Sequence, residues 1–268
     1  MPVRIGFVGA GKMAEAMLAG LIRRGAVAPG DLLASDVSAE RLQQLGARLG
    51  IGTTAENAAV PAFAPTVFLA VKPQQLDAVL AELAPRLDER HLLLSIAAGK
   101  RLERLEALAP RARVIRVMPN LPCTVGEGMS AFARGARATP ADAAAAAELL
   151  GCFGRALEVR ESALDAVTAL SGSGPAFFAY LLDSLARAAE AEGLARNDAL
   201  LLAEQTMLGT ARLLLDQGLA PADLAAAVTS ARGTTAAGRE VLENGEVARL
   251  LAATLRAAAA RSRELSRV

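Results

Sequence analysis

The sequence predicts an α/β fold, in which a doubly wound parallel sheet forms an N-terminal domain and an all-α domain follows it. Two observations lead to this prediction. Short apolar segments alternate with amphipathic segments as far as about residue 160, as in successive β-α-β units. Beyond about Glu161 only helical patterns occur. We therefore expect one domain over residues 1–160 and a second over residues 161–268.

The first strand and the turn that follows it carry the clearest motif. An apolar segment from Val3 to Val8 runs into Gly9-x-Gly11-x-x-Ala14, which begins an amphipathic helix ending near Arg24. Gly9 allows a tight turn, Gly11 lets the backbone approach a pyrophosphate, and Ala14 lets the helix pack closely on the sheet. The pattern indicates a Rossmann-type dinucleotide site. The alternative is a glycine-rich turn that binds nothing.

Further strands and helices are expected to complete this domain. We expect strands at residues 31–36, 66–71, 91–96 and 113–117, shorter strands at 128–132 and 156–159, and helices at 38–49, 54–59, 73–83 and 140–153. In doubly wound sheets ligands lie beyond the carboxyl ends of the strands. The residues expected there to bind the cofactor are Gly9, Gly11, Lys12, Met13, Asp36, Val71, Lys72, Pro73, Ala97 and Asn120.

The residue that ends the second strand bears on the choice of cofactor. Asp36 is placed to bond ribose hydroxyls, which favours NAD over the 2′-phosphate of NADP. Lys12 and Arg41 favour NADP, since either can pair with a phosphate. Asp36 can also be an ordinary turn residue. The expected cofactor is NADPH or NADH.

The second half has the pattern of successive helices. We expect a short helix at 162–170, a turn at 171–175 in which Ser173 caps the next helix, and helix ends at Gly193 and Gly218. Asn197 is expected to cap a further helix, and the last helix spans about residues 246–265. Nearly every helix has an apolar face, so we expect a dimer formed through this half. The alternative is an ordinary helical bundle.

Composition excludes several classes of partner. The net charge of +1 does not favour nucleic acid or a membrane surface. No apolar segment is long enough for a membrane span, and no signal peptide is evident. Cys123 and Cys152 lie far apart without histidine neighbours, which fits reduced thiols in a cytoplasmic protein and no metal site. His91, the single histidine, is interpreted as structural.

Several motifs resemble those of the pyrroline-5-carboxylate reductase family, over nearly the whole chain. They are residues 7–14, 71–74, 116–122, 165–176, 228–235 and 261–265, of which 165–176 is the most specific. The resemblance implies a C-terminal domain like that of 6-phosphogluconate dehydrogenase, a dimer of interlocked subunits and in many members a larger ring, possibly a decamer. It also implies hydride transfer from NAD(P)H to a cyclic imine, giving L-proline.

The resemblance assigns the substrate to the polar stretch at residues 228–235. It implies that Ser230, Gly233, Thr234 and Thr235 bind the substrate, with Thr235 as the catalytic residue that bonds the imine nitrogen. Two positions differ from the family pattern. Lys12 replaces an asparagine, and Ala231-Arg232 replaces Pro-Gly in the substrate loop. Arg232 adds a positive charge beside the proposed carboxylate site.

Two other functions are compatible with this architecture. A β-hydroxyacid or 6-phosphogluconate-type dehydrogenase needs a lysine acid/base on the first long C-terminal helix, but no lysine follows Lys100. A nucleotide-binding regulatory protein that has lost catalysis is supported only by the altered substrate loop.

Overall fold

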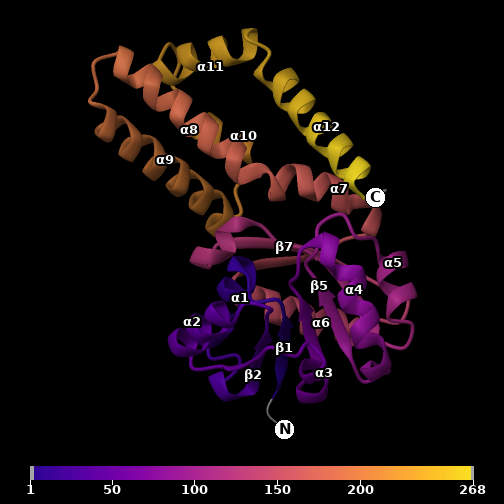
Figure 1. Cartoon of the computed structure of the whole chain (residues 1–268). Coiled ribbons are helices and arrows are strands. Elements are labelled where there is room, and N and C mark those ends of the chain that lie inside the picture. The colour runs from indigo at the N-terminus through magenta and orange to yellow at the C-terminus, as the bar shows by residue number, and fades with distance from the viewer. Residues whose placement is uncertain (1–2, 267–268) are drawn as a thin grey trace. The chain divides into compact units, whose positions relative to one another are not determined.

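The computed structural model describes residues 3–266. Residues 1–2 of the first predicted domain and 267–268 of the second therefore lie outside the described residues. The contacts divide the chain into two compact units. Residues 3–173 and 258–266 belong to the first, and Gly174–Ala257 forms the second. The first unit therefore includes residues just after 160 and the end of the last helix, which the sequence analysis assigns to the helical domain. Figure 1 labels the elements along the chain.

The first unit is built on an eight-stranded sheet in the order β3-β2-β1-β4-β5-β6-β7-β8. The strands are β1 (Ile5–Val8), β2 (Leu32–Ser35), β3 (Gly52–Thr54), β4 (Thr66–Leu69), β5 (Leu92–Ser95), β6 (Arg113–Met118), β7 (Gly128–Arg134) and β8 (Gly154–Glu158). β1 to β6 are parallel, β7 runs antiparallel to β6, and β8 is parallel to β7. The strand order reverses at β1, between β2 and β4, which confirms the doubly wound sheet.

Helices cover both faces of this sheet. They are α1 (Lys12–Arg23), α2 (Ala39–Leu49), α3 (Ala59–Phe63), α4 (Pro73–Leu83), α5 (Leu102–Leu108), α6 (Pro140–Gly151) and α7 (Leu164–Val167), with short 3₁₀ turns η1 (Pro29–Asp31), η2 (Ala84–Arg86), η3 (Leu121–Val125) and η4 (Glu161–Ala163). Alternate strand residues point to opposite faces, and they divide between two apolar clusters. One cluster contains residues of α1, α2 and α6, and the other contains residues of α3, α4, α5 and α7.

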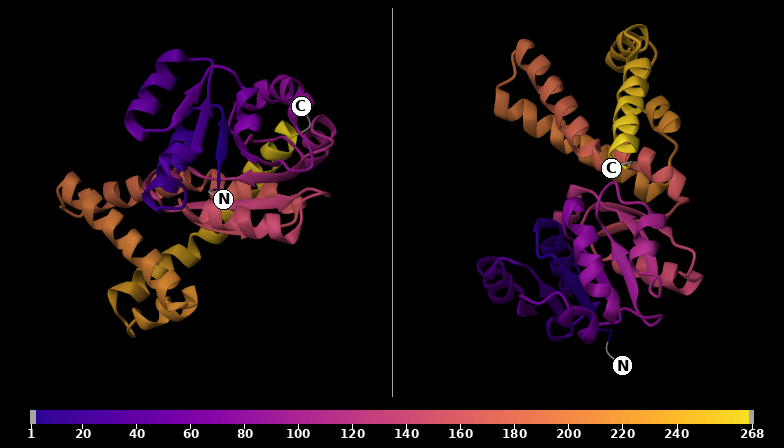
Figure 2. Two further views of the ribbon diagram at one scale, coloured as in Figure 1. Left: turned by 90° about the horizontal axis from the view of Figure 1, so that it is seen from below. Right: turned by 45° about the vertical axis from the view of Figure 1, so that its right-hand side comes forward.

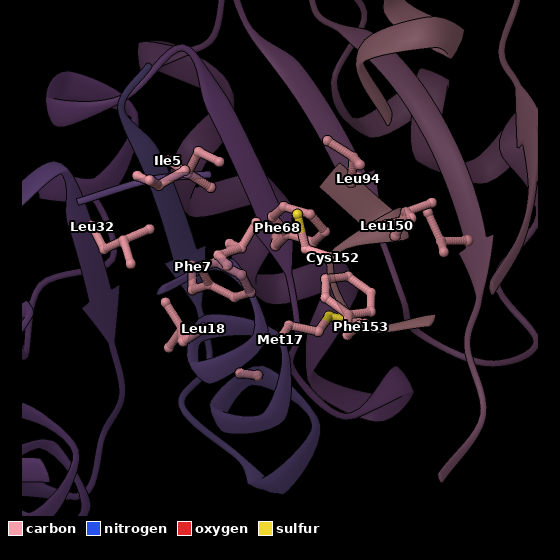
Figure 3. Close-up of a cluster of buried hydrophobic side chains, with 14 of the residues drawn as sticks. Ile5, Phe7, Met17, Leu18, Leu32, Phe68, Leu94, Leu150, Cys152 and Phe153 are labelled. Carbon is pink, nitrogen blue, oxygen red and sulfur yellow. The ribbon is translucent and has the colours of Figure 1, made fainter. Parts of the chain in front are cut away.

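The first of these clusters fixes the position of α1 (Figure 3). Phe7 of β1 and Phe68 of β4 stack with ring centroids 4.6 Å apart. A Cβ added at Gly20 of α1 would lie 3.0 Å from the Cβ of Phe153. Ala14 is also buried, as the fingerprint requires of a helix that packs closely on the sheet. The N-terminus of α1 is therefore held firmly at the end of β1.

Two predicted details of the first unit are wrong and one is confirmed. The helix expected at 54–59 is absent: β3 occupies Gly52–Thr54 and α3 begins at Ala59. β3 forms because it pairs with β2 as the outermost strand of the sheet, a contact that its own three residues do not encode. α5 was not predicted. Ser38 caps α2 as expected, its hydroxyl accepting from the Arg41 N–H.

The turn predicted at residues 171–175 is helical instead. α7 continues into the π-helical turn η5 (Thr168–Gly172), and α8 (Gly174–Ala191) begins directly after Ser173. Ser173 is the C-cap of the π-helical turn, and its N–H donates to the Thr168 carbonyl over 2.8 Å. Small residues here permit continuous winding where a break was expected.

The second unit is entirely helical. It contains α8, α9 (Arg196–Gln217), α10 (Pro221–Ala227), α11 (Thr234–Asn244) and the first part of α12 (Val247–Leu265). Figures 1 and 2 show α8 and α9 as an antiparallel pair. Gly193 and Gly218 follow these helices with φ of 97° and 65°, as predicted. Asn197 is not a cap, because α9 begins at Arg196 with Ala195 as its N-cap.

This unit buries very little of its apolar surface within one chain. In α8 to α11 the buried residues are Gly174, Ala186 and Ala199. Large apolar side chains remain exposed, among them Phe178, Tyr180, Leu201, Leu202, Leu208, Val241, Leu242 and Leu250. An apolar groove between α8 and α9 includes Leu185, Leu202 and Leu214. A single copy thus lacks a core for this unit.

Among residues 3–266, no helix combines the length and the apolar character that crossing a membrane requires.

Candidate cofactor and substrate site

The residues predicted to bind the cofactor lie at one edge of the sheet. Each follows the carboxyl end of a parallel strand: Gly9, Gly11, Lys12 and Met13 after β1, Asp36 after β2, Val71, Lys72 and Pro73 after β4, Ala97 after β5, and Asn120 after β6. Strands β2, β1 and β4 are neighbours, so their ends flank the point where the strand order reverses. Ligands of doubly wound sheets lie at such a point.

The turn after β1 has the form that a diphosphate needs. Gly9 has φ of 97°, and an added Cβ would lie 2.7 Å from the Ala70 carbonyl oxygen, so only glycine fits. Gly11 differs, since an added Cβ would have no heavy atom within 4 Å. Gly11 is the N-cap of α1 and makes no side-chain cap bond. The first N–H groups of α1 have no partner within the helix and no side-chain cap at Gly11, as in anion sites at helix N-termini.

The side chain of Asp36 supports this turn by accepting a hydrogen bond from its backbone. Its Oδ2 accepts from the Ala10 N–H over 2.8 Å, and its Oδ1 accepts from the Ser38 N–H over 3.0 Å. The side chain is half-buried. An ionised carboxylate offers about four acceptor positions, so it retains capacity for the ribose hydroxyls of a dinucleotide. Asp36 is thus more than an ordinary turn residue.

Arg41 contacts the other backbone polar group of Ala10. Its Nε donates to the Ala10 carbonyl over 2.6 Å, and its Nη2 pairs with Glu15. Arg48 approaches the second oxygen of Glu15 at 2.5 Å. Nothing in the sequence pattern distinguishes Glu15, since a glutamate in the first turn of a helix is common.

The remaining residues of the edge divide into exposed and engaged side chains. Lys12 and Lys72 are exposed, and neither ammonium has an ion-pair partner within residues 3–266. Asn120 is engaged: its Nδ2 lies 3.2 Å from the Ser171 carbonyl oxygen, and its Oδ1 accepts from the Met129 N–H over 2.8 Å. Its side chain therefore joins the end of β6 to the π-helical turn, a role that the sequence does not predict.

The side chains most often associated with acid/base or thiol chemistry are engaged or buried. His91 is buried, with its Nε2 3.0 Å from the Pro61 carbonyl oxygen and its Nδ1 3.0 Å from the Asp88 N–H. Both ring nitrogens thus have structural partners. Burial raises the pKa of the Cys123 and Cys152 thiols. No cluster of metal-binding side chains occurs in the part of the chain that the structure describes.

The residues predicted to bind the substrate lie in the second unit, where α10 is followed by α11. The Gly233 N–H donates to the Ser230 carbonyl over 3.0 Å and closes a turn, and Gly233 is the N-cap of α11. An added Cβ at Gly233 would lie 2.3 Å from the Ser230 hydroxyl oxygen and 3.2 Å from the Ser230 carbonyl oxygen, so a larger residue would require the serine side chain to move. Thr234 and Thr235 begin α11, which leaves their N–H groups unpaired within the helix. A helix start of this kind suits an anion, as does the start of α1.

Arg232 adopts the backbone that glycine favours. Its φ is 61°, so the loop keeps a left-handed residue although arginine replaces the glycine of the family pattern. Within the described residues its guanidinium has no hydrogen-bond or ion-pair partner, and it is exposed. Arginine at this position therefore carries some backbone strain and leaves a free positive charge beside the turn.

Comparison with known proteins identifies the family. Residues 161–265 match a family model described as pyrroline-5-carboxylate reductase dimerisation, and residues 4–99 match one described as NADP oxidoreductase, coenzyme F420-dependent. A pyrroline-5-carboxylate reductase of Methanosarcina acetivorans is 44% identical over 98% of both chains. The chain belongs to the pyrroline-5-carboxylate reductase family.

Solved structures of pyrroline-5-carboxylate reductases share its fold. One from Coxiella burnetii covers 99% of both chains with a TM-score of 0.96 and 33% identity. One from Plasmodium falciparum, with NADP bound, covers 98% of both chains with a TM-score of 0.85 and 26% identity. The Rossmann-type sheet and the helical dimerisation domain are therefore those of this family, and the helical region is one through which its members self-associate.

Proposed function

We propose that this protein reduces pyrroline-5-carboxylate to L-proline with NADPH or NADH, the last step of proline biosynthesis. The observation that carries the proposal is the open turn at Gly11, which fits a dinucleotide diphosphate at the sheet edge of a chain with full-length relatives named for this activity. When bound, the reduced nicotinamide supplies the hydride that adds to the imine carbon.

The chain holds the cofactor with the edge residues described above. The N–H groups at the start of α1, reached past Gly11, bind the diphosphate. Asp36 accepts from the adenosine ribose. Lys12 and Met13 follow Gly11 beside the diphosphate. Val71, Lys72, Pro73, Ala97 and Asn120, at the ends of β4, β5 and β6, line the nicotinamide half.

The substrate is a cyclic imine with a carboxylate, and the loop before α11 suits both groups. The Thr234 and Thr235 N–H groups bind the carboxylate, with Gly233 and Ser230 shaping the turn. The Thr235 hydroxyl hydrogen-bonds the imine nitrogen. The protonated imine is already a strong electrophile, so the protein contributes orientation rather than a general base. This agrees with the structural engagement of His91 and with the absence of lysine after Lys100.

Steady-state kinetics test the activity directly. We expect cofactor oxidation that depends on added pyrroline-5-carboxylate and produces proline. Oxidation of a 3-hydroxyacid with NAD⁺ or NADP⁺, without imine reduction, would indicate the dehydrogenase instead. Cofactor binding without turnover of either substrate would indicate a regulatory protein.

Replacing Arg232 by glycine separates the strain of the loop from its charge. Relief of the left-handed φ should raise the free energy of unfolding by about 1 kcal/mol. Loss of the guanidinium should raise KM for the imine severalfold, because a positive charge near the carboxylate is removed. Chemical denaturation and kinetics measure the two effects.

Glu246 provides the matched control for Arg232. It also has a positive φ, 52°, but lies between α11 and α12. Glu246→Gly should relieve strain and leave KM unchanged. An unchanged KM in Arg232→Gly would show that the arginine takes no part in binding.

We also propose that the assembly is at least a dimer, and we allow a ring of dimers such as a decamer. The exposed apolar residues of α8, α9, α11 and α12 support this proposal, because a second copy would cover them. We keep residues 161–268 as the dimerisation and substrate-binding domain. Sedimentation should show no active monomer at micromolar concentration, and an active monomer would refute the proposal.

We also propose that the protein is located in the cytoplasm. This location is supported by two buried cysteines that form no disulfide, as expected in a reducing compartment. The partners are the imine, the cofactor and further copies of the chain, and neither nucleic acid nor a membrane is proposed.

A further inference from the structure

Ala10, the residue between the two glycines of the fingerprint, is held through both of its backbone polar groups. The Ala10 N–H donates to Asp36 over 2.8 Å, and the Ala10 carbonyl accepts from the Nε of Arg41 over 2.6 Å. Both partners come from the segment around the start of α2. Asp36, which the sequence offers for the ribose, and Arg41, which it offers with Lys12 for a 2′-phosphate, are thus both engaged in positioning the phosphate turn.

The guanidinium of Arg41 is also already paired with a carboxylate. Its Nη2 pairs with Glu15 of α1, and the side chains of Arg41 and Glu15 are only 25% and 14% exposed. Glu15 also pairs with Arg48, whose side chain is 63% exposed. A carboxylate shielded to this degree competes strongly with any other anion for the same guanidinium, since ion pairs weaken mainly through solvent screening.

NADPH differs from NADH only by its 2′-phosphate. The competition of Glu15 for Arg41 therefore affects the binding of NADPH and not that of NADH. NADPH gains from an arginine that is free to pair its phosphate, whereas NADH gains from a carboxylate that bonds the ribose hydroxyls. Asp36 retains acceptor capacity for those hydroxyls. Arg41 already donates from its Nε to the Ala10 carbonyl and from its Nη2 to Glu15. A 2′-phosphate would meet Asp36 without the compensating charge of Arg41, with Lys12 as the other cation that the sequence offers for it.

We propose that Glu15 is a specificity-determining residue: by holding Arg41 against the Ala10 carbonyl, it withholds that guanidinium from a 2′-phosphate and makes the chain prefer NADH. This inference rests on the proposed function. It assigns cofactor choice to a residue of α1 that acts through Arg41, in addition to the acid at the end of β2.

Glu15→Ala tests the inference in the full-length protein. Calorimetric titration with NADH and with NADPH gives the ratio of their affinities, and kcat/KM with each gives the same ratio in turnover. We expect the ratio to move toward NADPH by about tenfold, because a released arginine forms charge-assisted bonds to phosphate. NADH affinity should change by less than about threefold. If Glu15→Ala lowers the melting temperature too far for titration, Glu15→Gln removes the charge with less loss of packing.

Two further variants distinguish release of Arg41 from a general change of charge. In Glu15→Ala combined with Arg41→Met, the ratio should return to that of Arg41→Met alone. Arg48→Met, which removes the more exposed partner of Glu15 and does not touch Ala10, should leave the ratio at its wild-type value. An unchanged ratio in Glu15→Ala, or a gain that persists without Arg41, would overturn the inference. A wild-type chain that binds neither dinucleotide would instead refute the proposed cofactor site itself.

Discussion

Replacing Gly11 by valine should lower the affinity for NADH and NADPH alike by about a hundredfold or more, because several charge-assisted bonds to the diphosphate are lost together. The first N–H groups of α1 follow Gly11 without a partner in the helix, and a valine side chain would fill the open space at the Gly11 Cβ position. The fold should survive, since an added Cβ meets no atom of the protein and φ is −65°. Calorimetry measures the affinity, and circular dichroism the fold.

Two other glycines serve as controls for this prediction. Gly30 of η1 is exposed and also has open space at its Cβ position, so Gly30→Val should leave both affinities unchanged. Gly9→Ala should instead destabilise the protein, because of its positive φ and the Ala70 carbonyl at 2.7 Å. Normal cofactor binding by a folded Gly11→Val variant would remove the diphosphate from this turn.

The sequence predicts most of the fold because its information there is local. The β1 turn combines an apolar strand, two spaced glycines and an amphipathic helix, each recognisable within a few residues. β3 is the contrasting case. Its three residues have no apolar alternation, and they form a strand only because β2 lies beside them. Asn197 shows a similar limit, since a good capping residue lies two positions from the actual N-cap.

The sequence offers the candidate residues of the site, but it does not show which of them form hydrogen bonds with one another. Asp36 and the Ala10 N–H are 26 positions apart, as are Arg41 and Glu15, and Asn120 and Ser171 are separated by 51. No periodicity specifies such contacts, because they arise when strand ends and helix ends meet at the sheet edge. The same limit applies to Arg232: the sequence shows that a glycine of the family pattern is missing, and only the backbone shows that the arginine is left-handed.

Thr235→Ala is expected to lower kcat/KM for the imine by roughly ten- to a hundredfold, with little effect on cofactor affinity. The hydroxyl is assigned to the imine nitrogen, and a hydrogen bond to a charged partner contributes about 1.5–3 kcal/mol. The variant keeps the backbone N–H at the start of α11, so carboxylate binding remains. Within the described residues the Thr235 hydroxyl makes no cap bond, because the N-cap of α11 is Gly233 and no side chain caps it. The hydroxyl is therefore available for a ligand.

The competing interpretation, that Thr235 only stabilises the start of α11, leads to a different result. Loss of a capping residue would lower the free energy of unfolding by about 1 kcal/mol and leave turnover nearly intact. We expect the reverse, a nearly unchanged melting temperature with impaired reduction of the imine. Thr254→Ala provides the control, since its hydroxyl donates to the Leu250 carbonyl within α12 over 3.0 Å and is assigned no part in binding. If Thr235→Ala and Thr254→Ala reduce the imine equally well, Thr235 belongs to the structure of the loop and the imine nitrogen must have another partner.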